Sequence, residues 1–172
     1  GRIGQRVGAL CRALGLRVAA FDPYMERSPV EGVEMVKDFR AILPETDFLC
    51  LHLPSTPETR DLIGAGELAL LKRGAFVLNC ARGGIVDEDV LCDALESGHL
   101  GGAGLDVFAK EPPDTAHRLF RQEKVLLSPH NAALTEECAI RMATQAVQNV
   151  LDCLDGKLQP RVVMNRREIG MA

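Results

Sequence analysis

Three ionisable side chains stand within a few residues of the ends of apolar runs: Arg82, Glu111 and His130. Short, nearly continuous apolar runs are typical of strands that are buried on both faces of a parallel sheet. The carboxyl ends of parallel strands meet at one edge of a sheet and face its ligand crevice, so we expect the three side chains to converge there.

This set of side chains suits the reduction of a carbonyl group that neighbours a carboxylate. Histidine exchanges protons most readily near neutral pH, which predicts that His130 is an acid/base group. A carboxylate such as Glu111 beside it orients the imidazole and favours its protonated form. Arg82 can bind a substrate carboxylate through two parallel hydrogen bonds. Each residue alone is also typical of an exposed loop, so the prediction rests on all three together.

A site for the hydride donor is indicated at the start of the chain. Gly1 and Gly4 match the second and third glycines of G-x-G-x-x-G, the fingerprint of a helix that binds a dinucleotide pyrophosphate. Asp22 follows Gly4 by 18 residues, where an acidic residue accepts hydrogen bonds from the adenosine ribose. Its charge would repel a 2′-phosphate, which favours NAD over NADP. Glycines that serve only packing and an Asp-Pro turn are the alternative explanations.

The first glycine of the fingerprint and the strand before it have no counterpart in the sequence. In a sheet of strand order 3-2-1-4-5-6, that strand lies in the middle, and its loss exposes two unpaired edges. We therefore expect a fragment of a longer protein. The expected fold class is α/β, a Rossmann-like doubly wound parallel sheet that lacks its first strand.

The alternation of apolar and amphipathic segments predicts the elements that position these residues. It is the pattern of an α/β protein with right-handed crossovers. Gly74 is expected to end a short helix, and Thr135 to cap a long one. We divide the chain into an NAD-binding Rossmann domain over 1–156 and a polar C-terminal tail over 157–172. Strands are expected over 17–21, 47–53, 75–80, 102–108 and 125–127, and helices over 4–14, 67–71, 87–95 and 135–154.

The composition is typical of a single globular domain. Of the 172 residues, 47% are hydrophobic and 26% are charged, and the formal net charge is −4. That charge offers no basic surface to nucleic acid, and no apolar run approaches the roughly 18 residues that span a membrane. The six cysteines form no C-x-x-C pair, which argues against a metal site or disulfide framework and for a reducing, cytoplasmic setting.

Taken together, the motifs resemble the D-isomer-specific 2-hydroxyacid dehydrogenases. The resemblance implies NAD-dependent interconversion of a small 2-oxo acid and a D-2-hydroxy acid, of the glyoxylate/hydroxypyruvate reductase or phosphoglycerate dehydrogenase type. It also implies a homodimer formed through the cofactor domain and a tail that returns to a missing substrate domain. The matching segments are GRIGQRV at 1–7, FDPY at 21–24, LHLPSTPETRDLI at 51–63, LLKRGAFVLNCARGGIVDEDVL at 70–91, GAGLDVFAKEPP at 102–113 and LLSPHNAALTEE at 126–137.

The resemblance further implies roles for individual residues. Arg82 would bind and polarise the substrate, and Glu111 would pair with His130, the acid/base group. The adenosine and pyrophosphate half of NAD would lie against Gly1, Arg2, Ile3, Gly4 and Asp22. The nicotinamide half would lie against Leu53, Pro54, Cys80, Ala81, Arg82, Asp106, His130, Asn131, Ala132 and Ala133.

A second class of protein shares these motifs. NAD(H)-responsive corepressors built on the same fold keep such residues but act through partner peptides and dimerisation, and fold alone does not separate the two classes. Substrate turnover does. We also expect the isolated chain, without its first strand and substrate-binding half, to have little or no activity.

Overall fold

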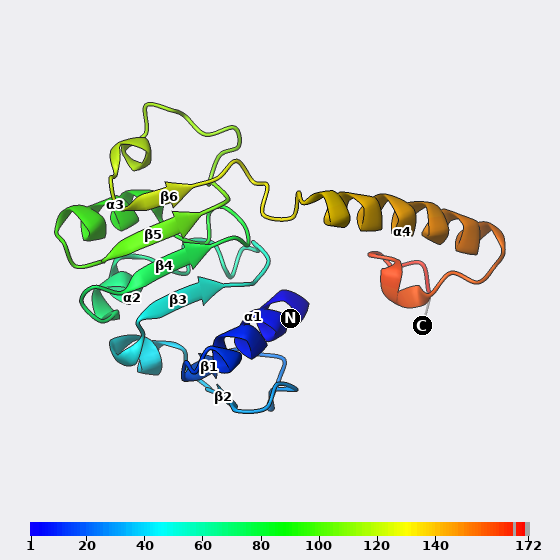
Figure 1. Cartoon of the computed structure of the whole chain (residues 1–172), viewed down its shortest axis with the longest axis horizontal. Helices are drawn as coiled ribbons and strands as arrows, with labels where there is room; N and C mark the ends of the chain where they lie inside the picture. Colours follow the sequence, from blue (N-terminus) through cyan, green and yellow to red (C-terminus); the bar gives the residue numbers. More distant parts are fainter. Residues whose placement is uncertain (167, 171–172) are drawn as a thin grey trace. The chain divides into compact units, whose positions relative to one another are not determined.

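The strands of the chain are parallel wherever they pair. The computed structural model describes residues 1–166 and 168–170. In one sheet β1 (Val18–Ala20) pairs with β2 (Val33–Met35). The other sheet has the order β3 (Phe48–Leu51), β4 (Phe76–Asn79), β5 (Gly102–Leu105) and β6 (Val125–Leu127), as Figure 1 shows.

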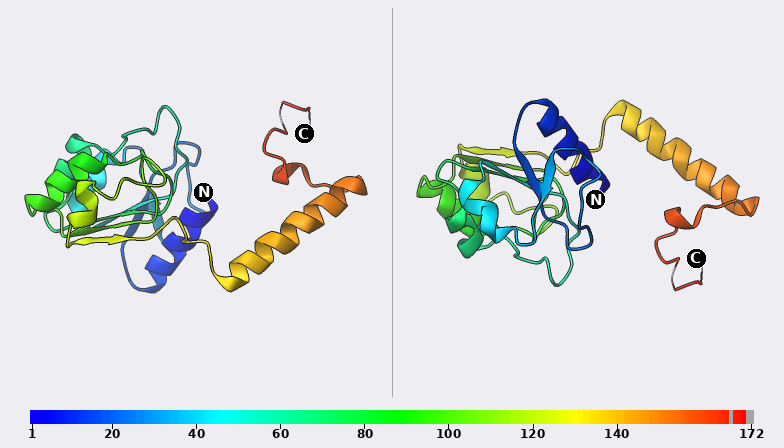
Figure 2. Two further views of the ribbon diagram at one scale, coloured as in Figure 1. Left: turned by 90° about the horizontal axis from the view of Figure 1, so that it is seen from above. Right: turned by 90° about the horizontal axis from the view of Figure 1, so that it is seen from below.

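Helices cover one face of the four-stranded sheet. Figure 2 shows α2 and α3 on this side, whereas α1 packs against β1 and β2 of the two-stranded sheet. This arrangement confirms the predicted α/β class with parallel strands. The α-helices are α1 (Arg2–Ala13), α2 (Ala65–Leu70), α3 (Glu88–Glu96) and α4 (Glu136–Leu154), and the 3-10 helices are η1 (Arg40–Glu45), η2 (Arg118–Arg121) and η3 (Pro160–Val162).

The two sheets follow the predicted strand order. The two-stranded sheet β2-β1 matches positions 3-2 of the predicted order 3-2-1-4-5-6, and the sheet β3-β4-β5-β6 matches positions 4-5-6 with one strand more. Because β1 and β3 do not pair with each other, each is an edge strand of its own sheet. The loops that carry most of the predicted site residues therefore follow strands of the four-stranded sheet, β3 to β6. Asp22 instead follows β1 of the two-stranded sheet.

Apart from element bounds that shift by up to three residues and the short 3-10 helices, two details differ from the sequence prediction. The strand β2 was not expected, because its three residues include the exposed Glu34 and form no apolar run. Gly74 does not end α2: the helix ends at Leu70, and Leu71 already has extended backbone. Gly74 has a φ of +85° and its N–H donates to the carbonyl of His99, so its left-handed conformation serves the turn into β4.

The core lies between the four-stranded sheet and helices α2 and α3. The opposite face of the sheet is more open: Phe48 and Phe76 stack with ring centroids 5.5 Å apart, yet they are 53% and 41% exposed. None of the described helices is long and apolar enough to cross a membrane. Fully buried side chains of the core include Leu43, Ile63, Leu68, Val77, Ile85, Leu91, Cys92, Leu100 and Leu119.

The chain divides into two compact units, Gly1–His130 and Asn131–Ala172. The second unit contains α4, whose start is capped as predicted: the Thr135 hydroxyl accepts a hydrogen bond from the N–H of Cys138. No described residue of α4 is buried, and its apolar side chains Val147 and Leu151 are 61% and 51% exposed.

Candidate active site

The structure joins two of the three predicted catalytic side chains. His130 Nδ1 lies 2.7 Å from Glu111 Oε2, and both side chains are partly exposed. The other carboxylate oxygen, Oε1, accepts a hydrogen bond of 3.1 Å from the N–H of Phe108. The hydrogen bond with His130, followed by that from Phe108, holds the pKa of the Glu111 carboxyl below its usual range. Glu111 is therefore a carboxylate at neutral pH.

The backbone of His130 is held in an uncommon conformation. Its φ of +53° lies in the left-handed region, and its N–H donates to the Ser128 carbonyl at 3.0 Å. Such strained positions are concentrated at functional sites. Because Nδ1 faces Glu111, Nε2 is the ring nitrogen that is left to exchange a proton with a ligand.

The third predicted catalytic residue, Arg82, lies in the loop after β4. Its guanidinium donates to the carbonyl of Ala81 at 2.6 Å, so it is not part of the Glu111–His130 pair in this structure. The loop is fixed by Asn79, a buried residue at the end of β4. The Asn79 amide donates to the Arg82 carbonyl at 2.9 Å and accepts from the Ala81 N–H at 3.1 Å.

The ends of β4, β5 and β6 surround a small hollow. Asp106 is 3% exposed, and Ser128 donates a 2.5 Å hydrogen bond to its Oδ1. Cys80 is an exposed residue, but partial burial of its thiol, followed by the charge of Asp106, raises the thiol pKa above the usual cysteine value. The thiol therefore stays protonated at neutral pH. The hollow has a volume of about 150 Å³ and is lined by Leu78, Cys80, Gly104, Leu105, Asp106, Leu126, Leu127 and Ser128.

The start of α1 fits the phosphate end of a dinucleotide. Among the described residues, no side chain caps the helix, and the space where Gly1 would carry a Cβ is open to 4 Å. Uncapped N–H groups of a first helical turn bind anions. Asp22 lies beside them, with Oδ2 3.4 Å from the Gly1 nitrogen and Oδ1 accepting from the Tyr24 N–H at 3.0 Å. Arg2 and Ile3 are exposed on this turn.

The third fingerprint glycine contacts a histidine that the sequence prediction did not include. A Cβ on Gly4 would lie 3.5 Å from His52 Cβ, directly after β3. Burial lowers the pKa of His52, so the ring is neutral at pH 7. Its Nε2 is buried and has no hydrogen-bond partner within the described part of the chain. His52 thus supports the first turn of α1 through packing.

The remaining predicted cofactor contacts lie in two places. Leu53 and Pro54 follow β3 in the first unit, half-buried and exposed respectively. Asn131, Ala132 and Ala133 are exposed residues at the start of the second unit. Their roles stay predictions.

Asn79 and His52 escaped the sequence prediction for different reasons. Asn79 is the last residue of an apolar run, where a buried amide gives no signal of its own, and His52 stands inside the segment LHLP as an ordinary strand-end residue. A polar residue at the end of a buried strand, just before a glycine-rich loop, is the one available hint for Asn79.

The fold and these residues define a class: an α/β dinucleotide-binding domain that carries a carboxylate–histidine pair and an arginine at the carboxyl ends of its strands. Residues 1–132 match the family model described as D-isomer specific 2-hydroxyacid dehydrogenase, NAD binding domain. The chain belongs to this family, and NAD is its cofactor.

Curated relatives extend the match. The chain is 40% identical over 165 residues to a D-3-phosphoglycerate dehydrogenase of Methanocaldococcus jannaschii, covering 95% of this chain and 31% of that protein. It is also 40% identical over 168 residues to a glyoxylate reductase of Aeropyrum pernix, covering 95% and 49%. The chain therefore spans 31% of the first relative's length and 49% of the second's.

Solved structures show the same domain. The D-lactate dehydrogenase of Lactobacillus jensenii, solved with NAD+, matches with a TM-score of 0.84 and 29% identity over 91% of this chain and 51% of that chain. The TT0316 protein of Thermus thermophilus matches with a TM-score of 0.84 and 39% identity, covering 93% and 50%.

Proposed function

We propose that the protein containing this chain is an NAD-dependent oxidoreductase that interconverts a small 2-oxo acid and a D-2-hydroxy acid. The observation that carries the proposal is the 2.7 Å contact between Glu111 and His130 beside the ends of the strands. The names of the relatives favour glyoxylate, or the 2-oxo acid that corresponds to 3-phosphoglycerate, 3-phosphohydroxypyruvate.

Each side chain has a defined part in this reaction. His130 Nε2 donates a proton to the carbonyl oxygen during reduction and takes it back during oxidation. Glu111 stabilises the imidazolium and fixes the orientation of the ring. Arg82 binds the substrate carboxylate and polarises the neighbouring carbonyl. When NADH is bound, it supplies the hydride for the carbonyl carbon.

The dinucleotide would be held by the residues around the start of α1. The N–H groups of Arg2 and Ile3 would receive the pyrophosphate, with Gly1 and Gly4 leaving room for it. Asp22 would accept hydrogen bonds from the adenosine ribose. At the other end, the nicotinamide would lie against Leu53, Pro54, Cys80, Ala81, Asp106, Asn131, Ala132 and Ala133.

The family resemblance also supports proposals about the whole protein. Residues 1–156 would form the NAD-binding domain, and 157–172 would return to a substrate-binding domain. We propose a homodimer formed through the cofactor domain, which light scattering of the purified protein would test. All six cysteine thiols are free, which suits the reducing cytoplasm as the proposed location.

The proposal is tested by NADH oxidation with the natural protein. The assay tests four 2-oxo acids in parallel: glyoxylate, hydroxypyruvate, pyruvate and 3-phosphohydroxypyruvate. A His130→Ala variant is assayed beside the natural protein. We expect turnover of at least one acid and a loss of about 10²–10⁴-fold in the variant, the usual contribution of acid/base catalysis. NADH binding without reduction of any of the four acids would instead favour an NAD(H)-responsive binding protein.

A further inference from the structure

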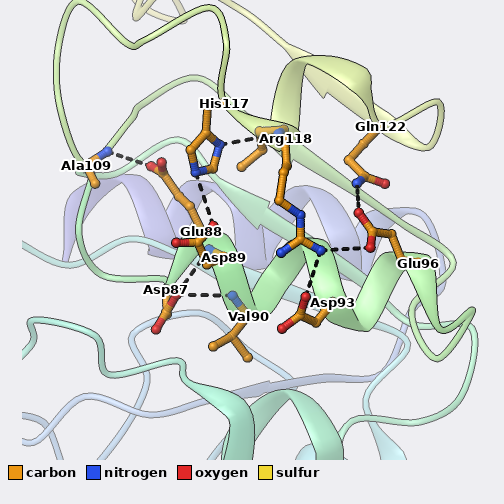
Figure 3. A network of polar contacts seen from close by, with 11 residues as sticks. Asp87, Glu88, Asp89, Val90, Asp93, Glu96, Ala109, His117, Arg118 and Gln122 are labelled. Atoms are coloured by element: carbon orange, nitrogen blue, oxygen red, sulfur yellow. Dashed lines mark hydrogen bonds and ion pairs between the residues drawn. The ribbon is translucent and has the colours of Figure 1, made fainter.

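The loop that carries Glu111 is attached to the start of α3. Glu88, the first residue of α3, points toward this loop, and its carboxylate accepts a 2.5 Å hydrogen bond from the N–H of Ala109 (Figure 3). The contact joins residues 21 positions apart in the sequence and lies two residues before Glu111.

Further polar contacts fasten the rest of this loop along α3. The dashed lines in Figure 3 show them following the helix toward its carboxyl end. The acidic partners Asp93 and Glu96 are 66% and 51% exposed, and ion pairs at such exposed positions contribute little to stability. They are His117 Nε2 to Asp89 at 3.4 Å, Arg118 to Asp93 and to Glu96 at 2.7 Å each, and Gln122 to Glu96 at 2.7 Å.

Glu88 differs from these residues because its partner adjoins the acid/base pair. The backbone at Phe108 and Ala109 has three constraints: the Phe108 N–H donates to Glu111, the Ala109 N–H donates to Glu88, and the Phe108 carbonyl lies against Gly83. A Cβ on Gly83 would be only 1.7 Å from the Phe108 oxygen. The loop of Arg82 therefore touches the same peptide that Glu88 holds.

The carboxylate of Glu88 is not needed as the helix cap. Asp87 is the N-cap of α3, and its Oδ1 accepts hydrogen bonds of 3.1 Å from the N–H groups of Asp89 and Val90. Because Asp87 already accepts hydrogen bonds from these N–H groups, the contact between Glu88 and Ala109 is not needed to cap the helix.

We propose that Glu88 is a positioning residue for the acid/base pair. Through Ala109 it fixes the position of the Phe108 N–H, and this N–H in turn holds the Glu111 carboxylate where it contacts His130. The effect of Glu88 on turnover rests on the proposed dehydrogenase function. Its effect on the position of Glu111 does not, because the Glu111–His130 contact exists without cofactor or substrate.

The test compares four variants of the natural protein. Glu88→Ala removes the acceptor, Glu88→Asp shortens it while keeping its charge, and Glu88→Gln keeps both its length and an acceptor oxygen. Glu96→Ala is the matched control, because it removes two contacts of the same loop at its far end. Thermal unfolding identifies variants that do not fold, and the Asp and Gln variants decide the question if the Ala variant is lost.

Two readouts separate the inference from the proposed function. The first is NMR titration of the Glu111 side-chain carboxyl in cofactor-free protein; the second is the pH profile of kcat/KM for the best 2-oxo acid. In Glu88→Ala and Glu88→Asp we expect the Glu111 titration midpoint and the acid limb of the profile to move to higher pH, with kcat about tenfold lower, the scale of one hydrogen bond to a charged group.

Glu88→Gln and Glu96→Ala should keep the wild-type midpoint and pH profile. A Glu111 midpoint that is unchanged in both Glu88→Ala and Glu88→Asp, or one that moves equally in Glu96→Ala, would overturn the positioning role. If the wild-type protein reduces no 2-oxo acid, the proposed function fails, and the titration midpoints still decide the role of Glu88.

Discussion

The Glu111 carboxylate takes part in two hydrogen bonds at once, one at each oxygen, and both stabilise its negative charge. One oxygen faces His130 Nδ1 and the other accepts from the Phe108 N–H, so both hydrogen bonds favour the ionised form. The lowered pKa of Glu111 means that the carboxylate persists as the pH falls through the ordinary range of glutamate. Its contribution to activity and to stability is therefore complete above that range and is lost only as pH falls through the lowered pKa.

At the residue scale, Glu111→Gln tests this charge. The amide retains hydrogen-bonding atoms but does not stabilise an imidazolium, so we expect kcat/KM for 2-oxo acid reduction to fall about 100-fold near neutral pH. The limb of the wild-type pH profile that reflects Glu111 ionisation, below the usual titration range of a glutamate carboxyl, should be absent from the variant. Steady-state NADH oxidation across pH measures both. A variant with wild-type rates would show that the carboxylate has no catalytic role.

We propose that the Asp22 carboxylate selects NAD over NADP. Its carboxylate lies beside the first turn of α1, where an adenosine 2′-phosphate would meet a like charge. Asp22→Asn removes the charge and keeps the hydrogen-bond acceptor for Tyr24. We expect the ratio of NADPH to NADH affinity to rise at least about tenfold, the scale of one unfavourable charge contact.

Fluorescence titration with each dinucleotide measures the affinities of Asp22→Asn. Asp38→Asn is the control, because Asp38 is an exposed turn residue that accepts from the Arg40 N–H. An unchanged NADPH/NADH ratio in Asp22→Asn would remove Asp22 from the cofactor site.

At the element scale, the loops after β4 and β5 position the chemistry because they touch each other's backbone. Asn79 ties the first of these loops to its own strand, and Gly83 brings it against Phe108 in the second. Only glycine permits such an approach, since any Cβ at this position overlaps the Phe108 carbonyl. The neighbouring Gly84 is needed for a different reason, a φ of +71° with no atom within 4 Å of the missing Cβ.

The two glycines therefore make a matched pair of variants. Gly84→Ala strains only its own backbone, and we expect it to lower the free energy of unfolding by about 1 kcal/mol. Gly83→Ala forces the two loops apart, and we expect a loss of about 3 kcal/mol together with most of the activity. Urea unfolding and NADH oxidation measure the two effects. Equal losses in both variants would contradict the role of the Gly83–Phe108 contact.

At the scale of the whole molecule, we expect the buried core cluster to stabilise the fold more than the surface ion pairs do. Leu91 on α3 is fully buried in the core between the sheet and its helices. By contrast, Lys72 and Asp47 form a 2.7 Å ion pair whose side chains are both more than half exposed. Exposed pairs are screened by water and salt, whereas a core cavity removes contacts that nothing replaces.

Leu91→Ala and Lys72→Ala test this distribution. We expect the first to lower the free energy of unfolding by about 2–5 kcal/mol and the second to change it by less than about 1 kcal/mol. Denaturant titration of both variants under identical conditions gives the comparison. Similar losses in the two variants would mean that the core does not dominate the stability of this domain.

Much of this architecture follows from local patterns of sequence. The apolar runs that become β3, β4, β5 and β6 are predicted within a few residues, because burial of consecutive side chains is written directly into residue type. The placement of Arg82, Glu111 and His130 after those strands follows from the same runs. The fingerprint glycines and Asp22 could be recognised because their spacing is fixed by one strand–helix–strand unit.

Tertiary structure alone decided which of these groups meet. Glu111 and His130 are 19 residues apart, and Glu88 and Ala109 are 21 apart, so no periodic pattern links them. The unpredicted β2 exists because a strand beside it supplies its hydrogen bonds. Hydrophobic periodicity encodes which side chains are buried. A hydrogen bond between segments far apart in the sequence depends instead on which strands lie next to each other in the sheet. For that reason the sequence by itself determined the class of fold and the kinds of residue at the site, and the packing of the loops after β4, β5 and β6 determined their geometry.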